Sequence, residues 1–243
     1  MEKPPKNRKI AKTRKLDDRE TFACEFCKHK FVTERGLLIH LCEPKRRHIQ
    51  RDDKHIKMAF IAYQRVFQQN MAKKVPPTYE SFAKSNLYLA FVRFARYLMN
   101  INAVNPLRFI DFLLRAEVGI DRWEQPFLYE TYVRELNKSE LPMEALERNM
   151  LLMQQWSVDT GDHWTDFFRK VAPAQATMWI KSGRLSPWII LTAISVDKLF
   201  ERLSPEQKTI VNTAIDKNFW QAKIGRHLEV AQNIRDELTS AGM

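Results

Sequence analysis

Cysteine and histidine residues at short spacings stand out near the beginning of this 243-residue chain. Cys24 and Cys27 form a CxxC pair, twelve residues separate Cys27 from His40, and Cys42 follows after one more residue. These three cysteines are the only ones in the chain. Thiolate sulfur and imidazole nitrogen at this spacing suit tetrahedral Zn²⁺, whereas cysteines confined to one short segment argue against a disulfide framework. The sequence therefore predicts one Zn²⁺ held by Cys24, Cys27, His40 and Cys42.

Apolar residues around these side chains have the spacing of a miniature core. Phe22 precedes the first cysteine by two residues, and Leu37 follows Phe31 by six. With this pattern, residues 22–48 resemble the C2H2 zinc-finger family, and the resemblance implies a ββα unit closed by Zn²⁺. A unit this short buries too little surface to fold without a metal or a cross-link.

The fourth ligand departs from the family pattern. A C2H2 finger has its second histidine after three to five intervening residues, and here those positions hold Pro44, Lys45 and Arg46. Residues two apart do not share a helix face, so His40 and Cys42 converge only if the helix ends between them. Pro44 favours such a break, because the residue before a proline avoids helical geometry. His48 is the alternative fourth ligand, and reduced, metal-free thiols are the alternative to any metal site.

Positive charge is concentrated on and around this segment. Residues 1–57 contain 17 Lys and Arg and 9 Asp and Glu, a net charge of +8 out of +11 for the whole chain. Such clusters attract phosphate backbones by releasing condensed counterions. We expect residues 1–20 to be a basic disordered arm. The candidate nucleic-acid contacts are Lys9, Lys12, Arg14, Lys15, Lys28, Lys30, Arg35, Lys45, Arg46 and Arg47. Ordinary surface charge that only confers solubility is the alternative, and a membrane surface is disfavoured because the segment lacks an apolar face.

The positions that read bases in DNA-binding fingers fall on Thr33, Gly36 and Ile39. None of these residues has the bidentate hydrogen-bonding geometry that recognises guanine or adenine, and one finger covers only about three base pairs. The sequence therefore favours contact with the nucleic-acid backbone, or with another protein, over sequence-specific reading.

After residue 48 the pattern becomes helical and predicts an all-α body. We expect a zinc finger at 21–48, a connecting helix and linker at 49–77, and a helical domain at 78–243. The connecting helix either joins finger and body as one rod or packs on the body. Several prolines are expected within the first turns of helices, where a missing N–H costs little; they are Pro106, Pro173, Pro187 and Pro205. Ser139 and Pro142 are expected to open another helix. Segment 205–239 is expected to form one or two amphipathic helices, with Lys217, Lys223, Arg226 and Arg235 on the outside.

No catalytic signature is present, so the sequence predicts a protein that is not an enzyme, and no small-molecule substrate is indicated. Asp159, Asp162 and Asp166 are candidates for a metal-dependent nuclease cluster, but acidic residues before a helix more commonly serve as caps. His163 is likewise expected to be a surface or capping residue and not a general base. The absence of a long apolar run and of a secretory signal predicts an intracellular protein with no membrane span.

Two functions remain open at this point. In the first, arm and finger grip the phosphates of DNA or RNA, while the helical body contacts a partner or self-associates. In the second, the finger is a protein-interaction adaptor that presents Glu34, Leu38 and Leu41. The layout of one N-terminal finger, a Lys/Arg run and a large helical body also resembles early proteins of large tailed phages, which implies action on nucleic acid or on the machinery that handles it.

Overall fold

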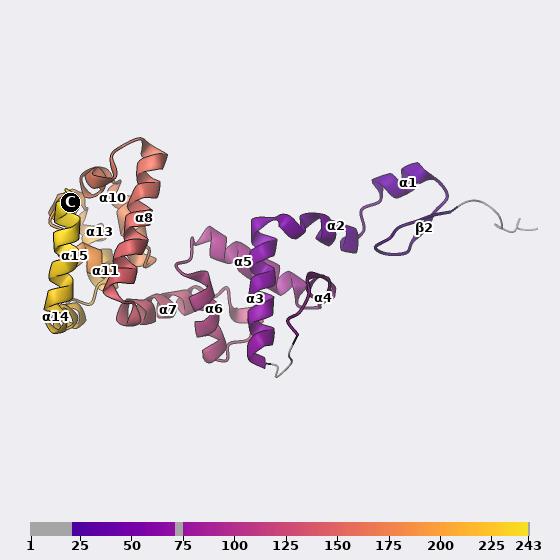
Figure 1. Cartoon of the computed structure of the whole chain (residues 1–243), viewed down its shortest axis with the longest axis horizontal. Coiled ribbons are helices and arrows are strands. Elements are labelled where there is room, and N and C mark those ends of the chain that lie inside the picture. Colours follow the sequence, from indigo (N-terminus) through magenta and orange to yellow (C-terminus); the bar gives the residue numbers. More distant parts are fainter. Residues whose placement is uncertain (1–20, 71–74, 243) are drawn as a thin grey trace, which may run out of the picture.

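The computed structural model describes residues 21–70 and 75–242. These residues form an all-α body preceded by a small ββα unit, as the sequence predicted. Figure 1 shows the ββα unit at one end of an elongated molecule and the C-terminal helices at the other. The arm residues Lys9, Lys12, Arg14 and Lys15 lie outside the described residues.

The ββα unit spans residues 22–42. Strand β1 (Phe22–Ala23) pairs antiparallel with β2 (Lys30–Phe31), with Phe22 opposite Phe31. Helix α1 (Glu34–Ile39) follows, and the Thr33 side chain caps it by accepting a hydrogen bond from the Gly36 N–H. With strands of only two residues, the sheet supplies little stability, so closure of the unit depends on the side chains that meet inside it.

Two short helical segments lead from the ββα unit into the body. They are α2 (Glu43–Ile49) and the 3₁₀ helix η1 (Gln50–Asp52), and the long helix α3 (Lys54–Asn70) follows. The expected single rod is therefore wrong: Asp53 has an extended backbone, and its carbonyl accepts the first hydrogen bond of α3, from the Lys57 N–H. Aspartate is favoured at this position before a helix, so the chain turns where one continuous helix was expected (Figure 1).

The first helical group, α3–α7, encloses an aromatic core. Its remaining elements are α4 (Tyr79–Lys84), α5 (Tyr88–Asn100), α6 (Pro106–Arg115), η2 (Ile120–Arg122) and α7 (Pro126–Ser139). Helix α3 packs along α5 and contributes Ile56 and Tyr63 to this core. The largest fully buried side chains here are Phe82, Phe91, Phe94, Phe109, Trp123 and Tyr132.

The second helical group, α8–α15, has a core of its own. It comprises α8 (Pro142–Thr160), η3 (Trp164–Asp166), α9 (Phe167–Lys170), α10 (Pro173–Lys181), α11 (Pro187–Thr192), α12 (Val196–Arg202), α13 (Pro205–Ala214), α14 (Lys217–Arg226) and α15 (Leu228–Ser240). Trp188, Phe167 and Phe168 are fully buried at its centre. The residues 78–243, expected as one domain, thus divide between two cores, and the first core also includes α3.

Prolines mark the beginnings of many of these helices. Pro106, Pro173, Pro187 and Pro205 all occupy the first turn, as predicted. Asn105 stands at the N-cap of α6 but makes no side-chain capping bond there. The first N–H groups of a helix have no intrahelical partner, so proline at these positions removes no hydrogen bond.

Three expectations for the body need correction. Ser139 ends α7 rather than opening a helix, because α8 begins at Pro142. Segment 205–239 forms three helices, not one or two, since the chain leaves helical geometry at Ile215 and again at His227. Lys223 is buried, not outside: its Nζ donates to the carbonyls of Asn137 (2.9 Å) and Lys138 (3.1 Å) near the end of α7. A cation suits this position because the last carbonyls of a helix lack intrahelical partners.

Candidate metal centre

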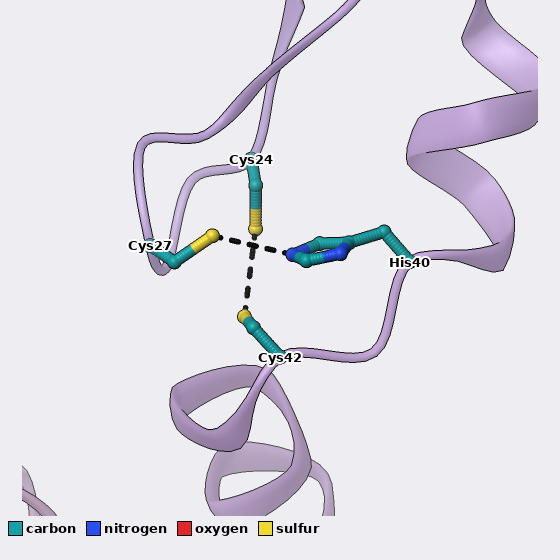
Figure 2. Close-up of side chains that lie close together, drawn as sticks. All are labelled: Cys24, Cys27, His40 and Cys42. Carbon is teal, nitrogen blue, oxygen red and sulfur yellow. Dashed lines mark hydrogen bonds between the residues drawn. The ribbon is translucent and has the colours of Figure 1, made fainter.

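The four predicted ligands lie together. The ligand atoms of Cys24, Cys27, His40 and Cys42 are all within 4.8 Å of one another. Figure 2 shows their side chains converging on one point, with Cys24 Sγ 3.8 Å from Cys42 Sγ and Cys27 Sγ 3.2 Å from His40 Nε2. A tetrahedron with metal–sulfur bonds of about 2.3 Å has a sulfur–sulfur edge of about 3.8 Å. The arrangement therefore has the dimensions to hold a tetrahedral metal ion.

A tight turn brings the two cysteines of the CxxC pair to the same side. Cys24 follows β1, and its carbonyl accepts a hydrogen bond from the Lys28 N–H at 2.8 Å. Lys28 adopts a left-handed backbone conformation (φ 62°), which reverses the chain between the strands. The Cys24 N–H then bonds the His29 carbonyl at 2.9 Å. Both thiols consequently converge with the side chains of His40 and Cys42 (Figure 2).

The break between His40 and Cys42 is the feature that lets them converge. Helix α1 ends at Ile39, and His40 has an extended backbone (φ −70°, ψ 123°). Cys42 is also extended and occupies the N-cap of α2, with Pro44 in the first turn of that helix. Pro44 thus favours the break as expected, and it does so by starting a second helix immediately after the last ligand.

His48, the alternative fourth ligand, lies elsewhere. It is in α2, and its ring packs beside Phe26 with ring centroids 5.0 Å apart. The group of side chains within residues 21–70 and 75–242 that lie close enough to hold a metal ion contains Cys42 and not His48. All four positions are filled by protein side chains, which is typical of a structural rather than a catalytic metal site.

The backbone around Cys24 favours its thiolate form. Its pKa is lowered chiefly by the backbone N–H of Cys27, with a further contribution from that of Phe26, and burial opposes both. The pKa of Cys27 is raised instead: the His29 backbone N–H lowers it, but burial and the neighbouring Cys24 and Cys42 thiols outweigh this. Thiolate is the form that binds metal, and the net effect of the surroundings favours it at Cys24 but not at Cys27. Three sulfurs and one imidazole nitrogen match the preference of Zn²⁺.

The cationic side chains near this centre fall into two sets. Lys28, Lys30 and Arg35 have no carboxylate partner in the described part of the chain. Lys45 also has no carboxylate partner there, but its Nζ donates to the His40 carbonyl at 3.0 Å, and Arg46 is paired with Glu43. The first set is therefore available to an external anion.

Arg47 has a structural role that the sequence did not indicate. Its Nη1 donates to the Ala83 carbonyl at 2.5 Å, and its guanidinium lies 4.1 Å from the centroid of the Tyr88 ring. The Tyr79 hydroxyl donates in turn to the Arg47 carbonyl. Only 17% of the Arg47 side chain is exposed. Arg47 also pairs with Glu43 four residues earlier, but its partners in the body lie more than thirty residues away in sequence. No local pattern could therefore have revealed that this arginine joins α2 to the body.

The helix face that reads bases in DNA-binding fingers is apolar here. Thr33 is occupied as the N-cap, and the Gly36 backbone lies against Phe31. Ile39 is 76% exposed, and its neighbours Leu38 and Leu41 are 70% and 61% exposed. Apolar side chains carry no hydrogen-bonding code for base edges, and a group of this kind on a surface is typical of contact with another apolar surface.

The acidic candidates in the body are engaged in ion pairs or local hydrogen bonds. Lys170 Nζ pairs with Asp162 at 2.6 Å and with Asp166 at 3.3 Å, while Asp159 accepts from Gln155. His163 caps η3, as expected. Within the described residues these carboxylates do not form a metal-binding group.

Comparisons with known proteins leave this site as the main guide to function. None of the described helices combines the length and the apolar character needed to cross a bilayer. No protein-family model, curated protein or solved structure matches the chain. The comparisons therefore do not support the resemblance of layout to phage early proteins, and what is established is an all-α protein with a zinc-finger-like Cys₃His group at its N-terminal end.

Proposed function

We propose that this protein binds nucleic acid through a Zn²⁺-closed ββα unit that contacts backbone phosphates with low sequence specificity. The observation that carries the proposal is the set of free cations Lys28, Lys30 and Arg35 on the unit that the metal would close. The arm adds further positive charge next to them in sequence. Phosphate contact needs cations at the surface and no base-reading side chains.

The helical body gives this contact a fixed base. Helix α2 begins directly after Cys42, its N-cap, and ends against the body, where Arg47 contacts Ala83 and Tyr88. A metal-closed unit attached in this way presents its cations in one orientation. Arg47 itself is committed to this contact, so Lys28, Lys30 and Arg35, together with the arm, are the principal phosphate ligands of the proposal.

The test is a salt series with duplex and single-stranded probes of random sequence. A protein that neutralises about five phosphates on duplex DNA has a log–log slope of affinity against salt of about −4 to −5. Replacing Lys28, Lys30 and Arg35 together with Ala is expected to weaken binding to every sequence and to make the slope shallower by about 2 to 3.

The matched control replaces three exposed cations of the body, Lys208, Lys217 and Arg235, with Ala. It changes the net charge by the same amount and is expected to leave the slope nearly unchanged. Equal losses in both triple variants would mean that overall charge, and not the ββα unit, drives binding. The absence of any binding at low salt by the zinc-loaded protein would refute the proposal.

A protein-interaction adaptor is the second candidate, favoured by the exposed Leu38, Ile39 and Leu41. Under this function, replacing Leu38 and Ile39 with Ser abolishes capture of a protein partner and leaves the salt slope on duplex DNA unchanged. Loss of nucleic-acid binding in the triple Lys28, Lys30 and Arg35 variant supports the first function. Loss of partner capture in the double Leu38 and Ile39 variant supports the second.

A further inference from the structure

A cavity of about 490 Å³ lies between the two helical groups, where α7 faces α10, α13 and α14. Small-molecule sites are commonly about 300–1,000 Å³ and often lie at such boundaries between packed units. The wall formed by α7 belongs to the first core, and the opposite wall belongs to the second. The cavity is far in sequence from the metal centre and plays no part in the function proposed above.

One buried polar group in the cavity wall lacks a partner. Asn137 is 8% exposed, and its side-chain oxygen Oδ1 is buried without a hydrogen-bond partner among the described residues. Buried polar groups are almost always hydrogen-bonded, so an exception calls for an explanation. The backbone carbonyl of Asn137 is already used by Lys223, and Oδ1 can accept from an N–H or O–H donor outside the chain once the side-chain amide turns toward the cavity.

Cations surround the same cavity. Arg134, Lys138 and Lys181 all line it, and in the described part of the chain none of the three pairs with a carboxylate. Two carboxylates also line it, Glu130 and Asp216, and Asp216 is the N-cap of α14, where its Oδ1 accepts from the Phe219 N–H at 3.0 Å. The lining thus carries an excess of positive charge, which favours an anionic ligand.

An aromatic ring completes the set. Phe219 lines the cavity, partly buried, and the Lys138 Nζ lies 5.9 Å from the centroid of its ring. Ile180 and Val133 add apolar surface nearby. A flat apolar wall, a buried acceptor and several cations together select a ligand with a planar ring, a hydrogen-bond donor and an anionic group.

We propose that this cavity binds a nucleotide. The base lies against Phe219 and donates a hydrogen bond to Asn137 Oδ1, and the phosphate is held by Arg134, Lys138 and Lys181. Base–aromatic stacking tolerates every base, whereas the hydrogen bond to Asn137 requires a ring or exocyclic N–H. The same chemistry is offered by a free nucleoside monophosphate and by one nucleotide of a single strand.

Calorimetric titration of the full-length, zinc-loaded protein with AMP, CMP, GMP and UMP tests the proposal, with adenosine and inorganic phosphate as partial ligands. We expect the nucleotides to bind at least about tenfold more tightly than either partial ligand. Replacing Lys138 and Lys181 together with Met is expected to weaken nucleotide binding at least about tenfold. The control Lys217→Met removes a neighbouring exposed charge outside the cavity and is expected to change affinity less than about twofold.

Two further variants separate the ring and the acceptor from the charge. Phe219→Leu is expected to weaken nucleotide binding at least about fivefold while leaving phosphate binding unchanged. Asn137→Leu is expected to raise the melting temperature of the unliganded protein, because it removes an unsatisfied acceptor, and to weaken nucleotide binding about tenfold. A lower melting temperature with unchanged nucleotide affinity would show instead that Asn137 is satisfied without a ligand, and would overturn the assignment.

Two further measurements identify the source of the nucleotide and test whether its binding is independent of the metal centre. Tighter binding of a single-stranded tetranucleotide than of a mononucleotide identifies a strand as the source, and the reverse identifies a free nucleotide. Cys24→Ser is expected to retain nucleotide binding at the cavity even if duplex binding is lost. No measurable binding of any of the four nucleotides at about 10 mM would refute this proposal without bearing on the ββα unit.

Discussion

At the scale of single residues, the choice of Cys42 over His48 defines the metal centre. The Sγ atoms of Cys42 and Cys24 are 3.8 Å apart, whereas the ring of His48 packs beside Phe26. A tetrahedral site needs four ligands at bonding distance at once. The single residue between His40 and Cys42 is sufficient because the backbone is extended there and not helical.

Metal analysis of two variants checks this choice. Cys42→Ser is expected to lower zinc affinity at least about tenfold, and His48→Ala is expected to retain one Zn²⁺ per chain. Digestion by protease near residues 22–42 provides a second readout, since the unit loses its closure with its metal. Zinc retained by Cys42→Ser and lost by His48→Ala would reverse the assignment.

Lys223 is a second single residue that is expected to contribute to the stability of the fold. Its Nζ bonds the Asn137 and Lys138 carbonyls and lies 4.8 Å from the Trp220 ring centroid and 5.1 Å from that of Trp188. Lys223→Met keeps most of the aliphatic stem and removes these bonds. We expect the free energy of unfolding at pH 7 to fall by about 1–3 kcal/mol, because two carbonyls lose their donor. Chemical denaturation of the wild type and Lys223→Met measures this change in the free energy of unfolding.

The same lysine predicts a pH dependence. Burial lowers the pKa of Lys223, and the Glu140 carboxylate opposes this. Between the lowered folded pKa and the unfolded value of about 10.4, the unfolded state binds more protons, so this group makes stability rise with pH. Below the folded pKa its contribution is constant. We therefore expect the stability difference between the wild type and Lys223→Met to vary with pH only in that alkaline window; a difference that varies mainly below pH 7 would contradict this account.

At the scale of elements, helix α2 connects the metal centre to the body. It begins directly after the candidate ligand Cys42, which is its N-cap, and Arg47 on its last turn contacts both α4 and α5. The adjacent Arg46 is 54% exposed and pairs only with Glu43. Both arginines thus pair with Glu43, but only Arg47 also contacts the body.

Arg46→Ala and Arg47→Ala form a matched pair that tests this connection. We expect Arg47→Ala to cost about 1–3 kcal/mol of stability, because the Ala83 carbonyl and the Tyr88 ring lose their cation. Arg46→Ala is expected to cost less than about 0.5 kcal/mol, as for most exposed pairs. Hydrogen exchange in α2 and α4 is expected to accelerate only in Arg47→Ala.

Two serines at the N-caps of helices α13 and α12 provide a second comparison at this scale. Ser204 caps α13 in a capping box with Gln207, whereas Ser195 stands before α12 without a capping bond and with its hydroxyl buried and unpartnered. Ser204→Ala is expected to cost about 1 kcal/mol. Ser195→Ala is expected to be neutral or stabilising, since it removes an unsatisfied polar group. The melting temperatures of both variants show whether a serine before a helix stabilises it only when its side chain makes the capping hydrogen bond.

At the scale of the whole molecule, two cores are joined through a few buried polar contacts. Arg148 bonds the Glu140 carboxylate through Nε and Nη2, and its Nη1 reaches the Gly183 carbonyl at 3.0 Å. Glu140 is almost completely buried, and the Tyr129 hydroxyl adds a bond to the Ser182 carbonyl. Removing one partner of such a buried ion pair costs far more stability than the intact pair contributes in net terms. These contacts therefore hold the two helical groups in one arrangement.

The division into cores predicts which fragments fold. Helix α3 supplies Ile56, Ala59, Ala62 and Tyr63 to the first core. A fragment of residues 53–243 is therefore expected to unfold cooperatively, whereas a fragment of residues 78–243 lacks one wall of that core and is expected to bind a hydrophobic dye. Equal stability of both fragments would show that α3 contributes nothing to the body.

The sequence by itself determined the parts that depend on neighbours along the chain. Ligand spacing, the apolar residues of the ββα unit and the prolines at helix starts act within a few residues, so Cys24, Cys27, His40, Cys42 and Pro205 were all placed correctly. Tertiary structure decided the rest. Lys223 resembled any lysine on an amphipathic helix, and Arg47 resembled a phosphate ligand, because burial and partners 36 to 86 residues away are set by packing of distant helices. The cavity around Asn137 exists only where two separately formed cores meet.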